Sequence, residues 1–338
     1  MSARLGIDIG GSGSRVALAI DGEPGPGNRS ESADRREFAG PRVRVRAGGD
    51  GVGELLGELL RRSRELWPDE LAGLSGIGVG ATGLATLVSD PDRLVRDIGR
   101  LSGPGAPPVL VAIDAVTAHL GALGGRDGAV VSLGTGAIAL GRRGAEWRRV
   151  DGWGHLLGDR GGGVQVGMRA LQLAMRAFDG VDDRGGALLE RAVRRFGEPL
   201  GWPAQLYTSE DRAGIMAAFA EDVVELAWTD AAAAGIVAEA GEEAARSVCA
   251  ALRPDQDPVV AATGGLFLGS DALAGAFARE LDRLRPDAIL VPALGDPLDG
   301  ALRLAELAAM GDAVATAPFI WDGSGSESGS GSGSAVRG

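Results

Sequence analysis

A strand, a glycine-rich turn and a second strand open the chain, and this order constrains the fold more than any other stretch. Residues 5–9 are apolar apart from Asp8, residues 10–13 are Gly-Gly-Ser-Gly, and residues 16–20 are rich in β-formers without a helical period. A dinucleotide-binding fingerprint or a Walker loop needs a helix directly after its glycines. The sequence instead predicts a β-hairpin whose backbone N–H groups and hydroxyls face a phosphate, with Asp8 beside a metal ion.

The chain contains no lysine, so all 34 of its basic residues are arginine. Codon bias is the simplest explanation, since the chain also contains 57 glycines. Whatever its cause, the absence of lysine excludes Walker-type sites, protein kinases, Schiff-base aldolases and pyridoxal enzymes, each of which depends on a lysine. Phosphate chemistry in this chain therefore has to depend on backbone donors, arginine, hydroxyls and a metal ion.

Composition limits the class of protein further. With 338 residues, of which 45% are hydrophobic, the chain is long enough for two domains with separate cores. The net charge of −12 argues against nucleic-acid binding but is compatible with ATP, because Mg²⁺ and local N–H groups can offset charge within a cleft. Cys249 is the only cysteine, which excludes an intrachain disulfide. No signal-peptide pattern or membrane-length apolar run occurs, so we expect a cytoplasmic protein without a membrane partner.

Hydrophobic periodicity predicts two α/β domains, over residues 1–114 and 115–311, hinged near residues 115–124, and a disordered Gly/Ser-rich tail over residues 312–338. The expected helices span residues 51–66, 91–101, 115–123, 161–193, 209–227, 231–252 and 298–310. The expected strands beyond the first hairpin span residues 77–80, 109–113, 129–133, 137–141, 258–262 and 288–291, with a short one near residues 43–45. Because residues 129–141 repeat the strand–turn–strand plan of the N-terminus, we expect two similar halves.

Three glycine turns and three carboxylates follow strand ends or turns along nearly the whole chain. The set consists of Asp8 with the turn at residues 10–13, Asp114, Gly134-Thr135-Gly136, Asp159 and Gly264-Gly265. Each feature alone is a weak indication, because glycine serves any tight turn and aspartate is a common cap or turn residue. Their order and spacing together point to one phosphate-handling site.

With these features the sequence resembles the N-acetylglucosamine kinase group within the BadF/BadG/BcrA/BcrD-type ATPase family, over about residues 4–310. The most similar local stretch is Gly-Trp-Gly-His-Leu-Leu-Gly-Asp at residues 152–159, followed by glycines and a helix. Supporting matches lie in the N-terminal hairpin and at residues 113–115, 133–136, 262–265 and 295–301. The resemblance implies the two-domain, ribonuclease H-like fold of actin, Hsp70 and sugar kinases, with a nucleotide cleft between the domains.

The resemblance also implies roles for individual residues. Asp114 would be the general base that accepts the proton of the attacking sugar hydroxyl, and Asp8 would hold Mg²⁺ through water. The ATP-binding residues would be Gly10, Gly11, Ser12 and Gly13 in the hairpin, Thr135 with Gly136 from the opposite domain, and Gly264 with Gly265 beside the adenosine. The sugar-binding residues would be Asp50, Thr82, Gly136, Trp153, Gly154 and Asp159.

Several of these residues have structural alternatives. Trp153 is as compatible with a core anchor as with a ring that stacks on a sugar, and Asp159 is compatible with a helix N-cap. His119 and His155 are the only histidines, which argues against a Ser–His–Asp hydrolase and against a histidine metal site. His119 is expected to be packed, and His155 to orient its loop.

Two departures from the family pattern affect the sugar pocket. The family usually has Gly-Asp-Glu-Gly-Ser where this chain has Gly-Asp-Arg-Gly-Gly, so Arg160 reverses a charge beside the pocket. A family asparagine that contacts the sugar falls where this chain reads Ala-Gly-Gly-Asp at residues 47–50. Asp50 could accept sugar hydroxyls or an amine, which weakens the assignment of an acetamido sugar.

We therefore expect an ATP- and Mg²⁺-dependent kinase of an amino sugar of the N-acetylglucosamine type. Glucosamine or another hexose is the alternative substrate, and a non-catalytic sugar or nucleotide sensor is the alternative class. An activator of a radical dehydratase shares the fold, but it needs cysteines for an iron–sulfur cluster, and this chain has one. The expected partner is a small-molecule sugar, with no nucleic acid and no membrane; a homodimer is left open.

Overall fold

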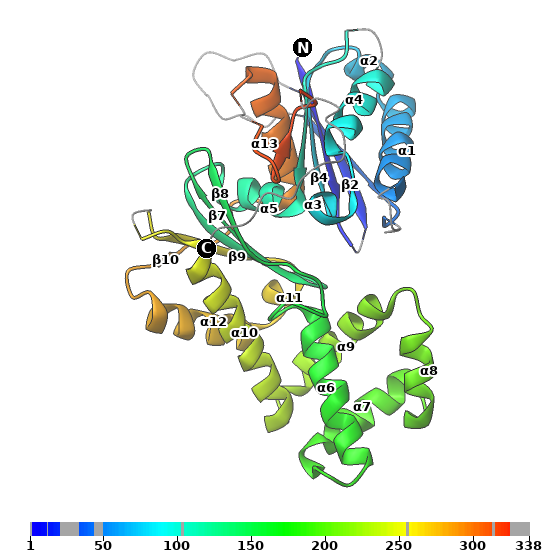
Figure 1. Ribbon diagram of the computed structural model, residues 1–338, viewed down its shortest axis with the longest axis vertical. Coiled ribbons are helices and arrows are strands. Elements are labelled where there is room, and N and C mark those ends of the chain that lie inside the picture. The colour runs from blue at the N-terminus through cyan, green and yellow to red at the C-terminus, as the bar shows by residue number, and fades with distance from the viewer. Residues whose placement is uncertain are drawn as a thin grey trace, which may run out of the picture.

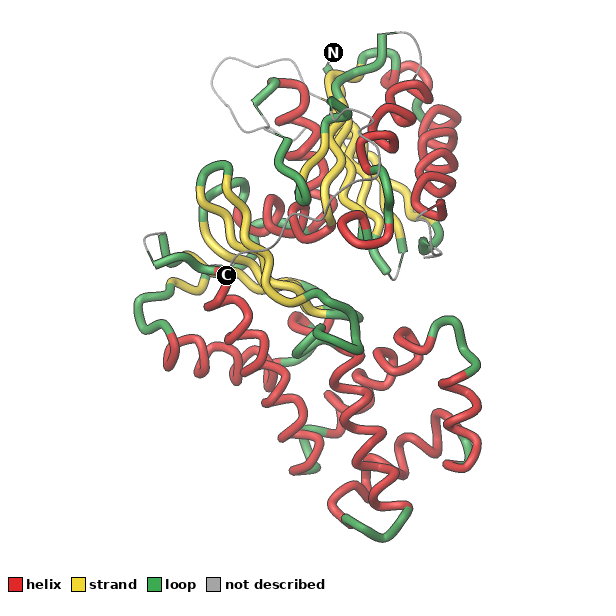
Figure 2. Tube along the Cα trace, in the orientation of Figure 1, coloured by secondary structure: helices red, strands yellow, loops and turns green. Residues whose placement is uncertain are grey.

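Two β-sheets, one in each half of the molecule, organise the structure, and helices cover both (Figures 1 and 2). The computed structural model describes residues 2–11, 13–20, 34–43, 50–102, 105–254, 257–312 and 315–324. In these residues no helix combines the length and the apolar character that crossing a bilayer requires.

The first sheet is mixed, with a parallel centre. Its strands are β1 (Ala3–Ile9), β2 (Ser14–Ile20), β3 (Asp34–Gly40), β4 (Leu74–Ala81), β5 (Val109–Ile113) and β11 (Ile320–Trp321), in the order β11-β5-β4-β1-β2-β3. Strands β1, β4 and β5 run parallel, whereas β2, β3 and β11 pair antiparallel. The carboxyl ends of the three parallel strands therefore meet at one edge of the sheet.

Helices of the first half lie on both faces of this sheet. One face carries α1 (Asp50–Leu66) and α4 (Pro91–Ser102), and the other carries α5 (Asp114–Leu123) and α13 (Pro297–Met310) (Figure 1). The short α2 (Pro68–Leu71) follows α1, and α3 (Leu84–Leu87) follows β4. All three parallel strands are thus covered on both faces, as their largely apolar sequences require.

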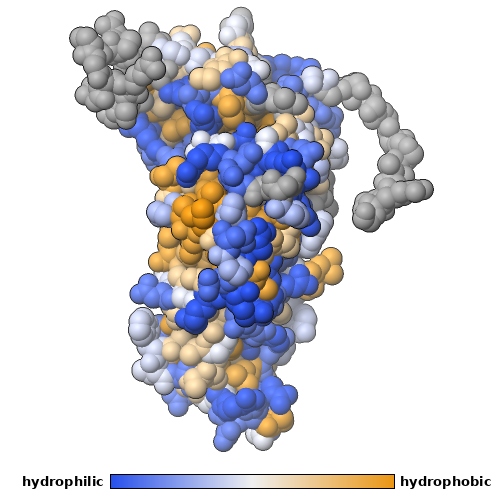
Figure 3. Space-filling view, turned by 90° about the vertical axis from the view of Figure 1, so that its left-hand side faces the viewer, coloured by the Kyte–Doolittle hydropathy of each residue, from blue (hydrophilic) through white to orange (hydrophobic). Residues whose placement is uncertain are grey.

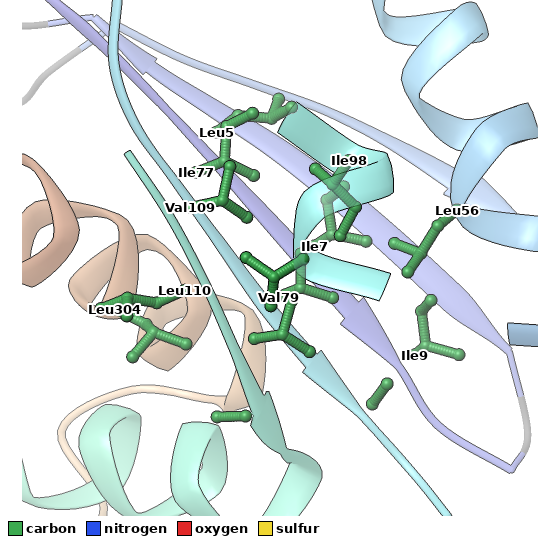
Figure 4. Packing of buried hydrophobic residues seen from close by; sticks show 14 of the residues in the cluster. Leu5, Ile7, Ile9, Leu56, Ile77, Val79, Ile98, Val109, Leu110 and Leu304 are labelled. Carbon is green, nitrogen blue, oxygen red and sulfur yellow. The ribbon is translucent and has the colours of Figure 1, made fainter. Parts of the chain in front are cut away.

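The two faces differ in residue size because side chains alternate along a strand. Figure 4 shows Leu5, Ile7 and Ile9 of β1 and Ile77 and Val79 of β4 packed toward Leu56 and Ile98 of the covering helices; all are buried. The alternate positions are small, with Gly6 in β1 and Gly76 and Gly78 in β4. A Cβ at Gly78 would lie 2.2 Å from the carbonyl oxygen of Ala301, and one at Gly6 would lie 2.8 Å from Leu302 N. The glycine positions let α13 lie directly on the sheet backbone.

A second close contact joins α13 to α5. A Cβ at Gly300 would lie 1.7 Å from the Thr117 carbonyl oxygen, and one at Gly121 would lie 2.0 Å from the Asp296 carbonyl oxygen. The two helices therefore cross with almost no side chain between them. Since Asp114 is the first residue of α5, this crossing helps to fix the position of Asp114.

The second sheet has the order β10-β9-β6-β7-β8 and is covered mainly by helices of the second half. Its strands are β6 (Gly128–Leu133), β7 (Ala137–Arg143), β8 (Glu146–Asp151), β9 (Val259–Thr263) and β10 (Ile289–Leu290). The helices are α6 (Gly163–Phe178), α7 (Gly186–Phe196), α8 (Trp202–Tyr207), α9 (Arg212–Leu226), α10 (Ala231–Ala251), α11 (Gly265–Leu268) and α12 (Asp271–Leu284), with 3₁₀ turns η1 (Asp183–Gly185) and η2 (Pro199–Gly201). Helices α6 to α9 extend away from the sheet (Figure 1).

The packing differs from the predicted organisation in several elements. Helix α13 packs on the first sheet, although residues 298–310 were expected to belong to the second domain. Strand β11 pairs with β5 at the edge of the same sheet, although residues 320–321 were expected to lie in the disordered tail. Strand β8 was not predicted, and the helix expected over residues 161–193 is divided into α6 and α7. A short strand was expected near residues 43–45, but Val43 is not in a strand, and the strand in this region is β3, which ends at Gly40. Residues 44–49 and 325–338 lie outside the described residues.

Figure 3 shows the side of the molecule that lies at the left in Figure 1, where apolar side chains gather at mid-height. Strand β10 lies on this side, and Ile289, Leu290 and Leu294 on and after it are exposed. Because β10 has only two residues, it leaves a short edge on the second sheet.

Among the described residues, contacts around α5 and near α9 join the two halves. Helix α5 packs against β6, β7 and β9 of the second sheet as well as against α13. Elsewhere, Arg42, which follows β3, donates a hydrogen bond of 2.7 Å to Asp211 Oδ2 at the N-terminus of α9. Both side chains are exposed, and pairs of this kind contribute about 0–1 kcal/mol.

His119 of α5 is buried beneath the second sheet, as the sequence analysis expected. Its Nε2 lies 3.2 Å from the Gly128 carbonyl oxygen, and the ring meets Trp147 edge-on at a centroid distance of 5.2 Å. Burial lowers the pKa of His119 from 6.5 to about 4, the Gly128 contact partly opposing it. The imidazole is therefore neutral in the folded protein at neutral pH.

Substitution Gly300→Ala should destabilise the fold by at least about 2 kcal/mol, because the added methyl group collides with the backbone of α5. Urea unfolding followed by circular dichroism measures the effect. Gly235→Ala in the exposed part of α10 is the matched control, since a Cβ there meets no atom within 4 Å. The control should gain about 0.5–1 kcal/mol from helix propensity. Equal stability of the two variants would contradict this packing.

Acidification should destabilise the protein through His119. The unfolded chain binds a proton at this residue below about pH 6.5, whereas the folded chain does so only near pH 4, so stability falls as the pH drops through this window. From about pH 7 to about pH 5 the His119 contribution to the loss is about 2 kcal/mol. In His119→Gln, the fall in unfolding free energy over this range should be smaller by that amount. An unchanged fall would show that His119 is not the group responsible.

Candidate functional site at the sheet edges

Asp8, Thr82 and Asp114 lie together at the carboxyl edge of the first sheet. Asp8 pairs in register with Gly80 of β4, and the Thr82 N–H donates to the Ile9 carbonyl oxygen at 2.9 Å. Asp114 follows β5 directly and begins α5. Three adjacent parallel strands thus bring two predicted carboxylates and a hydroxyl to one place, as expected from strands that end at the same edge.

Asp114 has partners that hold its carboxylate in place. Its Oδ1 accepts a hydrogen bond of 2.9 Å from the Ala115 N–H, and the Thr82 side chain also bonds to it. Burial raises the pKa of Asp114, and the two hydrogen bonds lower it by a smaller amount. The negative charge of Asp8 raises the pKa further, whereas the positive charge of Arg149 lowers it. A carboxylate with a raised pKa and a fixed orientation is suited to accept a proton.

Asp8 belongs to a chain of charges that the sequence analysis did not foresee. Arg15, its partner across the β1–β2 hairpin, donates to Asp8 Oδ2 at 3.1 Å and to Asp296 Oδ2 at 2.6 Å. Asp296 caps α13 in a capping box with Asp299. Burial nevertheless raises the pKa of Asp8, although Arg15 opposes the shift. The pairing of Asp8 with Arg15 is visible in the sequence only once the hairpin register is known.

The first glycine turn closes the β1–β2 hairpin. The Gly10 N–H donates to the Gly13 carbonyl oxygen at 2.9 Å, and a Cβ at Gly11 would meet no atom within 4 Å. Gly11 is exposed, and the β1–β2 hairpin points toward the second sheet in Figure 1. Ser12, the predicted phosphate ligand of this turn, lies outside the described residues.

The second glycine turn joins β6 to β7 and is attached to α6. The Gly134 N–H donates to the Gly136 carbonyl oxygen at 3.0 Å, and the N–H groups of Gly163 and Val164 donate to the Gly134 and Thr135 carbonyl oxygens at 2.9 Å. The Thr135 side chain is exposed, and a Cβ at Gly134 would meet no atom within 4 Å. Hydrogen bonds from α6 thus hold the turn on one side, while Thr135 on the other side is exposed. This arrangement suits a loop that binds phosphate.

The third glycine pair lies beside the second turn, because β6 and β9 are parallel neighbours. Gly264 has a φ of +100°, and a Cβ there would lie 2.2 Å from the Leu133 carbonyl oxygen, so only glycine fits. Gly265 begins α11, with open space where its Cβ would be. The structure thus brings the second and third predicted glycine sites together at one edge of the second sheet.

The loop over residues 152–162 decides between the alternatives for Trp153 and Asp159. Trp153 is 57% exposed, which excludes a core anchor. Gly162, not Asp159, is the N-cap residue of α6. Asp159 instead accepts a hydrogen bond of 3.1 Å from the Gly154 N–H, and burial raises the pKa of its carboxyl. Gly136 leaves space for this carboxylate, since a Cβ there would lie 2.5 Å from Asp159 Oδ2.

Asp151, which the sequence did not indicate as a site residue, holds this loop in place. Its buried carboxylate accepts hydrogen bonds from the Asp159 N–H at 2.8 Å and from the Arg160 N–H at 2.7 Å. The Arg160 side chain lies 3.8 Å from Asp151 Oδ1, so the arginine that replaces a family acid has a carboxylate beside it. The two hydrogen bonds fix the backbone on which Asp159 is mounted.

His155 and Gln165 add a further restraint to the same loop. The Gln165 side-chain amide donates to the carbonyl oxygens of His155 at 3.2 Å and of Gly158 at 3.1 Å. The contact at His155 thus comes from its backbone, which agrees with a residue of the loop framework.

Asp50 is the first residue of α1, and its side chain lies outside the described part of the structure. A cavity of about 400 Å³ lies between the loop, α6 and α10; its lining, as far as it is described, includes Leu157, Arg160 and Gln172 but neither Asp8 nor Asp114. This cavity is therefore separate from the carboxylates at the sheet edge.

Comparison with known proteins gives the family. The profile of the BadF/BadG/BcrA/BcrD ATPase family matches residues 5–300. The chain belongs to this family. The predicted ATPase family and the fold class are thereby confirmed, since solved sugar kinases of the actin/Hsp70/ROK fold are also similar in structure.

Individual relatives match different shares of the chain. The N-acetylmuramic acid/N-acetylglucosamine kinase of Clostridium acetobutylicum is 28% identical over 187 residues, which are 52% of this chain and 54% of that protein. The match thus spans about half the length of this curated relative. A candidate N-acetylglucosamine kinase from Chromobacterium violaceum has a TM-score of 0.68 at 25% identity, covering 89% of this chain and 98% of that one. A ROK family glucokinase from Streptomyces griseus, solved with glucose and AMPPNP, has a TM-score of 0.54 at 19% identity, covering 91% and 99%.

Substitution Asp151→Ala should loosen the loop over residues 152–162. It removes the acceptors of two backbone N–H groups and should lower the unfolding free energy by about 1–3 kcal/mol. Amide hydrogen exchange at Asp159 and Arg160 should become faster. Asp127→Ala is the control, because Asp127 accepts from the Gly144 N–H at an exposed turn. Unchanged exchange in Asp151→Ala would contradict the assigned role.

Proposed function

We propose that this chain is an ATP-dependent kinase that phosphorylates a hydroxyl group of an amino sugar. The observation that carries the proposal is the placement of Asp8, Thr82 and Asp114 at one sheet edge, with open glycine turns at the edges of both sheets. Membership in an ATPase family supports the use of ATP. The kinase names of the similar proteins from C. acetobutylicum and C. violaceum support a sugar as the acceptor.

Asp114 is the general base in this proposal. Its carboxylate accepts the proton of the sugar hydroxyl as the oxygen attacks the γ-phosphate; the new O–P bond forms while the bond to ADP breaks. Phosphoryl transfer depends mainly on positioning and electrostatics. Hydrogen bonds from Thr82 and Ala115 supply the positioning, because they orient the carboxylate before substrate binds.

The glycine turns and Asp8 bind Mg-ATP in this proposal. Backbone N–H groups at residues 10–13 and 134–136 take the phosphates, and Gly265 leaves room for the adenosine. Mg²⁺ would fit beside Asp8, because a carboxylate is a suitable ligand for this ion. Burial disfavours the ionised form of Asp8, and Arg15 offsets this effect only in part, so a further cation would stabilise the carboxylate. The described residues contain no cluster of three or more metal-ligating side chains, so phosphates and water would supply most ligands. The ion, when bound, neutralises charge on the transferred phosphate.

The sugar lies against Trp153 and Asp159 in this proposal, with Gly154, Gly136 and Thr82 nearby. An exposed indole ring offers a stacking surface, and the Asp159 carboxylate can accept hydrogen bonds from hydroxyls. N-acetylglucosamine is the first expected acceptor; N-acetylmuramic acid follows from the name of the curated relative. Glucosamine or another hexose is the second choice, because Asp50 stands where an asparagine is usual.

A screen of acceptors tests the proposal and the non-catalytic alternative together. ADP release is measured with N-acetylglucosamine, N-acetylmuramic acid, glucosamine and glucose in turn. Turnover with at least one amino sugar supports a kinase. Binding of ATP without turnover of any sugar would support a sensor of the same fold. The fit of Asp114 and Thr82 favours catalysis, because a sensor does not need a base at the sheet edge.

Substitution Asp114→Asn should lower kcat by about 10²- to 10⁴-fold, since the base is lost while Asn can still accept from Ala115 N–H. The KM for ATP should stay within about threefold, because Asp114 does not hold the nucleotide. Asp230→Asn, at the N-cap of α10, is the control and should keep full activity. If Asp114→Asn phosphorylates the sugar at the original rate, Asp114 is not the base.

A further inference from the structure

Arg149 of β8 has a fixed guanidinium beside the sugar loop. Its Nε donates to the Asp151 carbonyl oxygen at 2.9 Å, and its Nη2 donates to the Gly152 carbonyl oxygen. The guanidinium carbon lies 4.1 Å from the centroid of the Trp153 ring. The side chain is thus held by two backbone acceptors and by an aromatic face, so it has little freedom to move.

Arg149 covers one face of an otherwise exposed ring. Trp153 is 57% exposed although the guanidinium lies on it, so much of the indole remains open to a ligand. A sugar that stacks on the open face meets a ring that already has a favoured orientation. Preorganisation of this kind lowers the entropy that binding costs.

We propose that Arg149 is a positioning residue that orients the Trp153 ring for the sugar. This inference rests on the proposed sugar-kinase function and adds a residue that supports the sugar-stacking ring from behind. Loss of the guanidinium should weaken sugar binding through the ring and leave the chemical step unchanged.

Arg149→Gln tests this consequence in the full-length protein. We expect the KM for the sugar to rise about tenfold, because the ring loses the group that orients it. The kcat and the KM for ATP should remain within about threefold of the wild-type values, because the proposal gives Arg149 no part in the chemical step or in nucleotide binding.

Arg142→Gln is the matched control. Arg142 also lies over a tryptophan, 5.4 Å from the Trp147 centroid, and also donates to two backbone oxygens, those of Gly125 and Gly144. Trp147 packs against the buried His119 and is not part of the proposed sugar site. This variant should therefore keep the wild-type KM for the sugar.

Arg149→Lys tests whether the planar guanidinium is needed. Lysine keeps the charge but lacks the planar fork, so the KM for the sugar should stay raised. The inference is overturned if Arg149→Gln matches Arg142→Gln in the KM for the sugar, or if kcat falls by as large a factor as the KM rises. Failure of the wild-type protein to phosphorylate any amino sugar would instead refute the proposed function, which the same assay reports separately.

Discussion

The position of the candidate base depends on backbone contacts between α13, α5 and the first sheet. Glycines at alternate positions of β1 and β4 let α13 lie on the strands, and Gly121 with Gly300 lets α5 lie on α13. At these glycines the backbones meet directly, so side chains cannot absorb small displacements there. Asp114, at the first residue of α5, is consequently held against the strand ends that carry Asp8 and Thr82.

Arginine side chains supply the positive charges in this site, for which many phosphate-binding proteins use lysine. Arg15 connects Asp8 to Asp296, Arg160 lies beside Asp151, and Arg149 attracts Asp114. A planar guanidinium can bond to two acceptors at once, which an ammonium group on a flexible stem does less well. The lysine-free composition is thus compatible with an ordered site, because Arg15 and Arg149 are each held by two acceptors.

The sequence predicted those parts of the site that follow from strand ends. Asp8, Asp114 and the turns at residues 134–136 and 264–265 were found because an apolar run followed by a carboxylate or glycine marks a sheet edge. Asp151, Arg15 and Arg149 were missed because their roles depend on hairpin register and on a loop with left-handed residues, which local periodicity does not encode. Strand β11 was missed because two residues carry no pattern; their pairing with β5 is a long-range contact.

The exposed pair between Arg42 and Asp211 has a consequence for how the halves move. Near α9 this contact links the halves through two solvated side chains, whereas α5 links them through buried packing. If the halves separate, we therefore expect the Arg42–Asp211 pair to break before the packing around α5 does. Since dissolved ions screen an exposed ion pair and hardly affect buried packing, such a separation near α9 should become easier at higher ionic strength.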